Sequence, residues 1–203
     1  MQKNNYKTKG GYTIIETMIA VSLFVVIVLS GMGALLNANL LHNKSQDMRS
    51  IMDNLSFIME DMSRNLRTGY MYHCGDFSNI DTARSCELGG NIFFEEAPHG
   101  DPSDEDDQWG YKIESTDGGL TFNISKSTKG GEAGTWVQLN PPEVVIDGAS
   151  GFTVVGAEPH SEGDEQQPFI TIKLVGHIML KDPVTPFSLQ TSVSQRLLDI
   201  SDI

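Results

Sequence analysis

The sequence predicts an α+β protein with one long N-terminal helix packed on a mostly antiparallel sheet. The first half of that helix is predicted to span a membrane and the second half to be amphipathic. Three observations lead to this fold: an apolar run near the N-terminus, a methionine-rich stripe with helical spacing, and only short strand-like runs after Gly69. A chain of 203 residues is long enough for one ordinary domain and an appendage.

The apolar run, residues 14–36, reads IIETMIAVSLFVVIVLSGMGALL. Its 23 residues would cross about 30 Å of hydrocarbon as a helix. Lysines precede the run and acidic residues follow later, so the positive-inside rule places the N-terminus in the cytoplasm and the rest outside. A cleaved secretory signal peptide fits poorly, because Met32 lies three residues before the best cut near Gly33 and Ala34. An uncut signal anchor would not require the carboxylate of Glu16.

The helix is expected to continue beyond the membrane, over residues 13–67 and about 80 Å in all. Apolar residues recur every three or four positions in this second half: Met48, Ile51, Met52, Leu55, Ile58, Met59, Met62 and Leu66. Such a stripe is predicted to pack on a sheet as core rather than to form a ligand groove. Gly69 is expected to end the helix in a left-handed conformation. Gly31 and Gly33 would either make the helix compliant or let a neighbouring helix approach.

Strands are predicted where β-branched and aromatic residues gather. The predicted ranges are 70–73, 92–94, 109–115, 120–125, 135–139, 144–147, 152–155, 169–180 and 187–198. Leu120, Phe122 and Ile124 alternate with polar residues, which indicates one buried face. The sequence Asp117-Gly118-Gly119 predicts a hairpin turn, and Pro183 and Pro186 are expected to separate the last two strands.

The charge balance argues against nucleic-acid binding. The net charge is −13, and the 14 basic residues less Lys3, Lys7 and Lys9 leave 11 against 27 acidic residues after Gly11. Nucleic-acid binding needs a basic face that displaces counterions from phosphate. The acidity fits a solvated exterior surface.

The two cysteines, Cys74 and Cys86, predict one disulfide and an oxidising compartment. Closing a loop of this size would stabilise the fold by roughly 3 kcal/mol. Two separate buried thiols are the alternative. A zinc site is disfavoured, because no CxxC pair or histidine cluster completes four ligands.

Residues 11–16, Gly-Tyr-Thr-Ile-Ile-Glu, follow a basic leader and open the apolar helix. They resemble the prepilin-type leader of type IV pilins and type II secretion pseudopilins, departing from the usual form by tyrosine for phenylalanine and isoleucine for leucine. The resemblance implies cleavage after Gly11 by a prepilin peptidase and N-methylation of Tyr12. It divides the chain into a leader (1–11), a transmembrane and filament-core helix (12–36) and an extracytoplasmic globular domain (37–203).

The resemblance also implies a partner for Glu16. After cleavage Tyr12 carries a charged amine, and the Glu16 carboxylate would pair with the amine of a neighbouring subunit or with its own. In a poorly hydrated setting this attraction is a few kcal/mol, and it would set the register between subunits. The alternative is a glutamate in the first helical turn that interacts with the helix dipole, worth under about 1 kcal/mol.

Three later stretches read NPPEVVIDGASGFTV (140–154), ITIKLVGHIML (170–180) and LQTSVSQRLLDI (189–200). They loosely resemble the larger minor pilins and pseudopilins of the PilW and GspJ type. This implies a structural subunit at the tip, or in the priming complex, of a type IV pilus or a type II secretion pseudopilus. Its partners would be other pilins or pseudopilins, the prepilin peptidase, the inner-membrane assembly platform and membrane lipid. The protein would be a single-pass protein of the cytoplasmic membrane before assembly, then periplasmic or extracellular. The competing hypothesis is a membrane-anchored adhesin or binding module that uses the same leader.

No catalytic motif is visible, so an enzyme is not expected. The acidic stretch 95–110 contains Asp101, Asp104 and Asp106, which could help to bind calcium, but the EF-hand spacing is missing. An exposed, flexible charged loop is the commoner interpretation, and residues 158–168 are predicted to form a second polar loop. The five scattered histidines are expected to be surface or packed residues rather than ligands. No other cofactor is expected.

Overall fold

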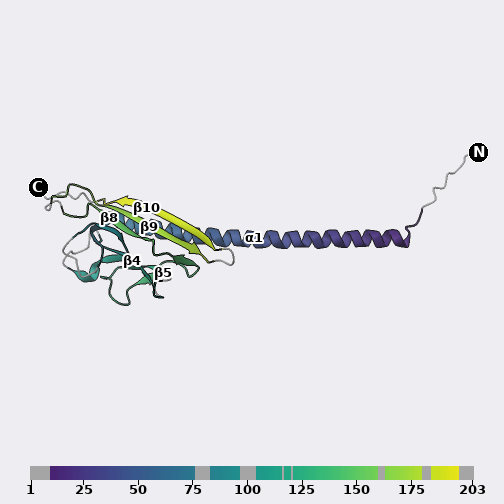
Figure 1. Ribbon diagram of the computed structural model, residues 1–203, viewed down its shortest axis with the longest axis horizontal. Helices are drawn as coiled ribbons and strands as arrows, with labels where there is room; N and C mark the ends of the chain where they lie inside the picture. The colour runs from purple at the N-terminus through teal and green to yellow at the C-terminus, as the bar shows by residue number, and fades with distance from the viewer. Residues whose placement is uncertain are drawn as a thin grey trace, which may run out of the picture. The chain divides into compact units, whose positions relative to one another are not determined.

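The computed structural model describes residues 10–75, 83–96, 104–115, 117–119, 121–159, 163–179 and 184–196. The chain divides into two compact units, residues 1–46 and 47–203. Helix α1 (Ile14–Thr68) begins in the first unit and ends in the second. In the second unit the helix lies against a sheet whose described pairings are all antiparallel, which confirms the predicted α+β class (Figure 1).

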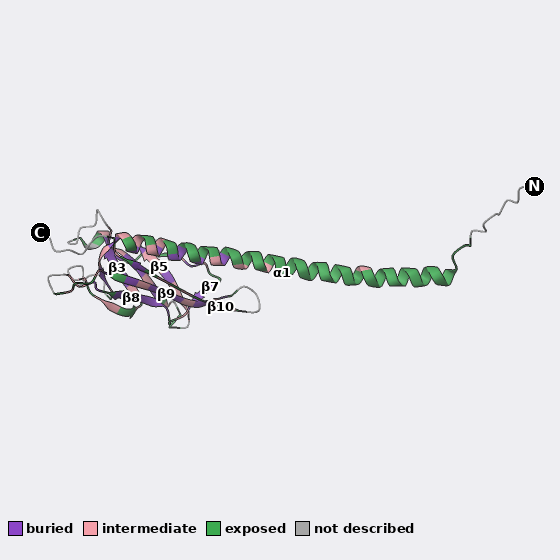
Figure 2. Ribbon diagram, turned by 90° about the horizontal axis from the view of Figure 1, so that it is seen from above, coloured by how far each residue is buried: buried purple, intermediate pink, exposed green. Residues whose placement is uncertain are grey.

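The C-terminal part of α1 forms the core of the second unit together with the sheet. Six residues of the predicted stripe are buried in it: Ile51, Leu55, Ile58, Met59, Met62 and Leu66. Burial of a side chain of this size contributes about 1.5–3 kcal/mol. Figure 2 shows this part of the helix against the buried faces of the strands. The prediction that the methionine-rich stripe is core is confirmed.

The end of α1 differs from the prediction in one respect. Gly69 donates its N–H to the carbonyl of Asn65 at 3.0 Å, but it does not adopt the left-handed conformation. Its lack of a side chain matters for packing instead, because a Cβ at this position would lie 2.3 Å from Cδ2 of Phe94. The Tyr72 hydroxyl donates to the carbonyls of Leu66 and Gly69, and so helps to cap the last turn of the helix.

Within the described residues the sheet has ten strands. They are β1 (Tyr70–His73), β2 (Cys86–Gly89), β3 (Asn91–Glu95), β4 (Trp109–Ser115), β5 (Phe122–Ser127), β6 (Val137–Gln138), β7 (Val144–Ile146), β8 (Gly151–Val155), β9 (Phe169–Ile178) and β10 (Thr185–Ser194). The main path runs β1-β3-β4-β5-β7-β9-β8-β2; β10 pairs with β9 and β6 with β5. Strands β7 and β8 follow one another along one edge of β9, and β10 covers the other edge.

Most of the predicted strands are confirmed, with β1 and β4 at the predicted bounds. Strand β5 starts two residues later than predicted, β6 is only two residues long, and β9 and β10 end earlier. Strand β2 was not predicted. Its sequence, Cys-Glu-Leu-Gly, has no alternation, and its pairing with β8 shifts register around Leu88, whose φ is 49°.

The prediction that Pro186 separates the last two strands is wrong, because Pro186 lies inside β10. The Gln195 N–H donates to the Pro168 carbonyl at 3.0 Å, in register with the β9–β10 ladder. Hydrogen-bonded pairs alternate along an antiparallel ladder, so odd-numbered residues of β10 bond to β9 and even-numbered ones direct their backbone groups outward. A proline at position 186 therefore removes no ladder hydrogen bond.

The predicted turn between β4 and β5 is confirmed. The two strands pair up to Ser115 opposite Phe122, and Gly118 and Gly119 both have positive φ. The Asp117 carboxylate accepts hydrogen bonds from the backbone N–H of Thr121 at 2.8 Å and from its hydroxyl at 2.6 Å. In β5, Ile124 is buried and Phe122 is half-buried, whereas Leu120 lies outside the described residues.

The acidic stretch 95–110 is only partly the exposed loop that was predicted. Glu95 is the last residue of β3 and is buried, which corrects the prediction at that position. Residues Glu105–Asp107 form the short 3-10 helix η1, and the side chain of Asp104 caps it by accepting from the Asp106 N–H at 3.0 Å. Asp101 lies outside the described residues.

Candidate functional site

The start of α1 is the first part of the candidate site. Gly11 and Tyr12 precede the helix in an irregular, exposed segment. Thr13 caps the helix: its hydroxyl accepts from the Glu16 N–H at 3.3 Å, and its carbonyl accepts from the Thr17 N–H at 3.2 Å. Glu16 therefore occupies the first turn. The lysines of the predicted leader lie outside the described residues.

The capping role of Thr13 was not predicted. Thr13 and Glu16 have the Thr-x-x-Glu spacing of a capping box, immediately before an apolar run. That spacing alone could have identified Thr13 as the cap. A glutamate at this place in a helix is favourably placed relative to the helix dipole, so the dipole interpretation of Glu16 and the intersubunit interpretation are both compatible with its position.

The apolar surface of α1 is the second part. No described residue of the first unit is buried, including large side chains such as Leu23, Phe24 and Ile27 (Figure 2). A continuous exposed apolar surface of this kind indicates a membrane or a protein partner. By length and composition this helix could cross a membrane.

Polar side chains within the apolar part of α1 bond to the helix itself. The hydroxyls of Thr17 and Ser22 donate to carbonyls three residues earlier, and Ser30 donates to the carbonyl of Val26, each at 2.8 Å. Internal satisfaction of polar groups is what a lipid environment requires, because hydrocarbon offers no hydrogen-bonding partner. These hydroxyls are therefore compatible with a helix in lipid.

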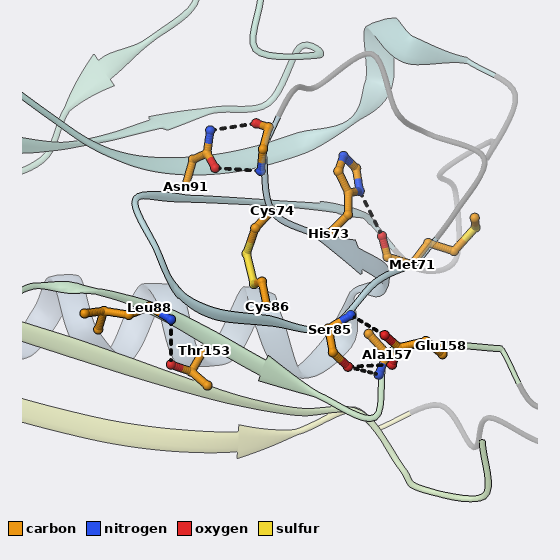
Figure 3. Close-up of a disulfide and its surroundings, with 11 residues drawn as sticks. Met71, His73, Cys74, Ser85, Cys86, Leu88, Asn91, Thr153, Ala157 and Glu158 are labelled. Atoms are coloured by element: carbon orange, nitrogen blue, oxygen red, sulfur yellow. Dashed lines mark hydrogen bonds between the residues drawn. A yellow bond between two sulfur atoms is a disulfide. The ribbon is translucent and has the colours of Figure 1, made fainter.

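The predicted disulfide between Cys74 and Cys86 is present, with an S–S distance of 1.97 Å (Figure 3). Cys74 follows β1 and Cys86 opens β2, and these two strands are the ends of the main path of the sheet. The Arg84 N–H also donates to the Tyr72 carbonyl at 2.8 Å beside this bond. The disulfide thus joins the two ends of the sheet.

Glu158 stabilises the chain next to the disulfide. Its carboxylate accepts hydrogen bonds from both the backbone N–H of Ser85, at 2.9 Å, and the Ser85 hydroxyl, which in turn accepts from the Ala157 N–H (Figure 3). The hydrogen bond from the Ser85 hydroxyl lowers the pKa of Glu158 below its usual value. Residues 158–168 contain no strand or helix where they are described, as predicted. Glu158, however, is not simply a solvated residue, because its carboxylate bonds this loop to Ser85.

A polar cluster connects α1 to the sheet. Asp61 Oδ2 lies 3.1 Å from Lys126 Nζ on β5 and accepts from the Tyr111 hydroxyl on β4 at 3.2 Å. Asn65 donates to the same hydroxyl at 2.7 Å, and the Lys126 ammonium lies 4.6 Å from the ring centroid of Trp109. Burial raises the pKa of Asp61, but the hydrogen bond and charge of Lys126 outweigh it, so the pKa lies below its usual value.

No local sequence pattern indicates this cluster, because Lys126 is 65 residues from Asp61 and only the fold brings the two side chains together. In the sequence, Asp61 is a polar residue between the apolar positions of the helix. It is three residues after Ile58 and four before Asn65, at the border of the buried stripe. A polar residue at this border is close enough to the sheet to contact it, and this spacing is the local signal for the role of Asp61.

The structure provides no metal site within the residues that it describes: no group of three or more His, Cys, Asp or Glu side chains gathers there. Of the calcium candidates, Asp104 caps η1 and Asp106 is exposed. Among the histidines, His73 is buried and stacks on Phe93 with ring centroids 5.5 Å apart, which agrees with a packed histidine.

Comparison with known proteins does not identify a relative. No family model matches the chain, and neither the curated proteins nor the solved structures include a significant match.

Proposed function

We propose that this protein is a minor pilin or pseudopilin, a structural subunit of a type IV pilus or a type II secretion pseudopilus. In this proposal the chain enters the cytoplasmic membrane with its N-terminus inside and is cut after Gly11 by a prepilin peptidase. The new N-terminus at Tyr12 is methylated. The subunit then joins other pilins or pseudopilins through the assembly platform, at the tip of the filament or in its priming complex.

One observation carries the proposal: a Gly-Tyr-Thr-Ile-Ile-Glu motif directly precedes an exposed apolar helix that continues, without a break, into the core of an α+β domain. A secretory signal peptide would be removed at the end of its apolar segment and would not need to belong to a folded domain. Here the helix runs through to Thr68 and buries six residues in the second unit. The apolar segment is thus continuous with a helix that belongs to the core of the domain.

The role proposed for Glu16 follows from electrostatics. A carboxylate within a bundle of apolar helices is costly unless it meets a positive charge. The α-amine released at Tyr12 would be four residues away along the chain, about 6 Å at the rise of a helix. Pairing between neighbouring subunits would fix how far one helix slides along the next.

The first test is mass spectrometry of the mature protein purified from its native membrane. The proposal expects a chain that begins at Tyr12 and is 14 Da heavier than the unmodified sequence because of one added methyl group. A chain that retains residues 1–11 would contradict the proposal.

The second test is Glu16→Ala, with Glu60→Ala as the matched control. Both residues are exposed glutamates of the same helix, but Glu60 lies in the second unit, away from the apolar segment. Loss of an intersubunit ion pair worth a few kcal/mol should reduce co-purification with sister subunits at least tenfold, while membrane insertion stays unchanged. Glu60→Ala should behave as wild type. Undiminished assembly of the Glu16→Ala variant would argue for the helix-dipole role.

The same co-purification separates the proposal from a membrane-anchored binding module. An adhesin that uses this leader would be cut and methylated in the same way, so the mature N-terminus alone does not distinguish them. Only a filament subunit should require Glu16 for association with other leader-bearing subunits.

A further inference from the structure

The outer edge of β10 is a long strand edge that no described strand covers. Strand β10 pairs with β9 over all ten of its residues, from Thr185 opposite Ile178 to Ser194 opposite Phe169, with no register shift. Within the described ranges it pairs with no other strand. Figure 1 shows β10, in yellow, at the margin of the sheet beside β9.

The alternation of the ladder identifies which groups are available at this edge. Because odd-numbered residues bond to β9, the backbone N–H and C=O groups of the even-numbered residues point away from it. From Ser188 onward these are Ser188, Gln190, Ser192 and Ser194, all of them exposed or half-exposed. Residues 187–194 would accommodate a partner strand of about 26 Å.

Strand β10 has few of the features by which natural edge strands avoid pairing. It contains no charged residue and no bulge, although charges, bulges and prolines are the usual protective devices. Pro186 is such a protective residue, but it lies at the N-terminal end of the strand only. A regular, uncharged edge that no described strand covers is suited to accept another strand.

A hollow lies at the C-terminal end of β10. It measures about 400 Å³ and is lined by Arg67, Ser194, Gln195 and Arg196. The Arg196 N–H donates to the Arg67 carbonyl at 2.8 Å, which keeps the two residues together. Within the part of the chain that the structure describes, neither arginine forms an ion pair, even though acidic residues outnumber basic ones by 27 to 14. Two arginines that line one hollow and form no described ion pair favour a carboxylate ligand.

We propose that the outer edge of β10 binds an extended segment of a partner protein as an added antiparallel strand, and that Arg67 and Arg196 hold a carboxylate near the N-terminus of that segment. In an antiparallel pair the N-terminal end of the added strand lies beside the C-terminal end of β10, where the hollow is. The occupant is an alternating polar and apolar segment with one or two leading acidic residues. A second copy of β10 does not qualify, because Thr-Pro-Phe-Ser-Leu-Gln-Thr-Ser-Val-Ser contains no carboxylate. The edge belongs to the second unit, so its use does not depend on cleavage at Gly11.

The probe is a fluorescently labelled, acetylated octapeptide, Asp-Asp-Thr-Val-Thr-Val-Thr-Val, titrated with the full-length protein in detergent micelles. We expect saturable binding that weakens as salt rises, because the arginine contacts are screened. A peptide with two lysines in place of the aspartates should bind at least tenfold more weakly. Absence of saturable binding, or equal binding of the lysine peptide, would overturn the proposal.

Two variants of one residue test the edge itself. Gln190→Pro removes an outward N–H and places a ring on the edge but leaves the ladder to β9 intact, as Pro186 does; Gln190→Ala keeps the N–H. Binding of the probe should fall at least tenfold in the first variant and stay within twofold in the second. The double variant R67Q/R196Q should bind at least fivefold more weakly and lose its salt dependence. Equal binding by Gln190→Pro, with its melting temperature maintained, would refute the strand-addition mode.

Backbone methylation of the probe gives a test that changes nothing in the protein. An added strand bonds to β10 through every second N–H only. N-methylation of the three threonines and N-methylation of the three valines should therefore differ, with one set abolishing binding and the other tolerated. Equal effects of the two sets would exclude a strand ladder.

Discussion

At the scale of single residues, Asp61 shows how one carboxylate can fix a helix on a sheet. Its Oδ2 contacts Lys126 on β5 and the Tyr111 hydroxyl on β4, and Asn65, on the next turn of α1, donates to the same hydroxyl. The side chains of Asp61 and Lys126 are 22% and 19% exposed, so solvent screens this pair less than a surface pair. A pair of this kind sets the rotation of α1 about its axis, which apolar packing specifies less sharply.

Replacement of Asp61 by asparagine should destabilise the second unit by about 1–3 kcal/mol, because Lys126 loses its counter-charge while it remains largely buried. Asp53→Asn, on the exposed face of the same helix, is the control and should change the free energy of unfolding by less than about 0.5 kcal/mol. Urea denaturation at neutral pH measures both. Equal effects of the two substitutions would show that the pair contributes nothing specific.

The same residue predicts a pH dependence. The pKa of Asp61 is lower in the folded protein than in the unfolded chain, so the unfolded state takes up the proton first as the pH falls. The stabilisation is therefore complete above the unfolded pKa of about 3.9 and is lost as the pH drops through the folded value. In acid titrations of stability, Asp61→Asn should lose less than the wild type does below about pH 4. Parallel curves for the two proteins would contradict this assignment.

At the scale of elements, the disulfide links the two end strands of the main path of the sheet. Strands β1 and β2 lie at opposite ends of the main path, and the bond between Cys74 and Cys86 joins them. Strand β2 has only four residues and pairs irregularly with β8. A strand so short gains little from its own ladder, so the covalent bond and the Ser85–Glu158 hydrogen bonds supply what the ladder does not.

Replacement of both cysteines by serine should lower the free energy of unfolding by about 2–4 kcal/mol, chiefly because the unfolded chain gains conformational freedom. Denaturant unfolding of the double variant, and of the wild type with and without reductant, measures the effect. The oxidised wild type should be the most stable, and the reduced wild type should match the double variant within about 0.5 kcal/mol. An unchanged free energy of unfolding on reduction would mean that the disulfide does not stabilise the fold.

The elements differ in how far the sequence could predict them. Helix α1 was predicted within one residue at each end, because 3.6-residue periodicity over many turns is a strong signal. Strands β6 and β2 were poorly predicted or missed, because two to four residues carry no period. The error at Pro186 has another cause. Proline breaks a strand only if its position must donate to a neighbour, and that depends on which strand lies at the edge.

At the scale of the whole molecule, a helix that could span a membrane and a folded domain share one continuous element. An ordinary domain buries its large apolar side chains, but none in the described part of the first unit is buried. Lipid before assembly, and neighbouring helices after it, would cover them in the proposed role. Lipid and neighbouring helices would each exclude water from the same apolar residues.

The double variant Val25→Arg and Val26→Arg tests the membrane part of this interpretation. Arginine near the centre of a membrane helix costs about 2.5–3.5 kcal/mol per residue in insertion, so much of the protein should leave the membrane fraction on alkaline carbonate extraction. Asn43→Arg with Gln46→Arg adds the same charge beyond the apolar run and should remain membrane-bound. Equal extraction of both variants would exclude a transmembrane role for residues 14–36.

The sequence by itself determined the helix, its apolar and amphipathic halves, the disulfide and most of the strands. Each of these depends on spacing or composition within a short window, which a single chain displays directly. Only the tertiary structure placed Asp61 beside Lys126, made Gly69 a packing contact with Phe94, and left the outer edge of β10 without a partner among the described strands. Those features arise from pairings between residues far apart in the chain, and strand order is a property of the assembled sheet that no local pattern encodes.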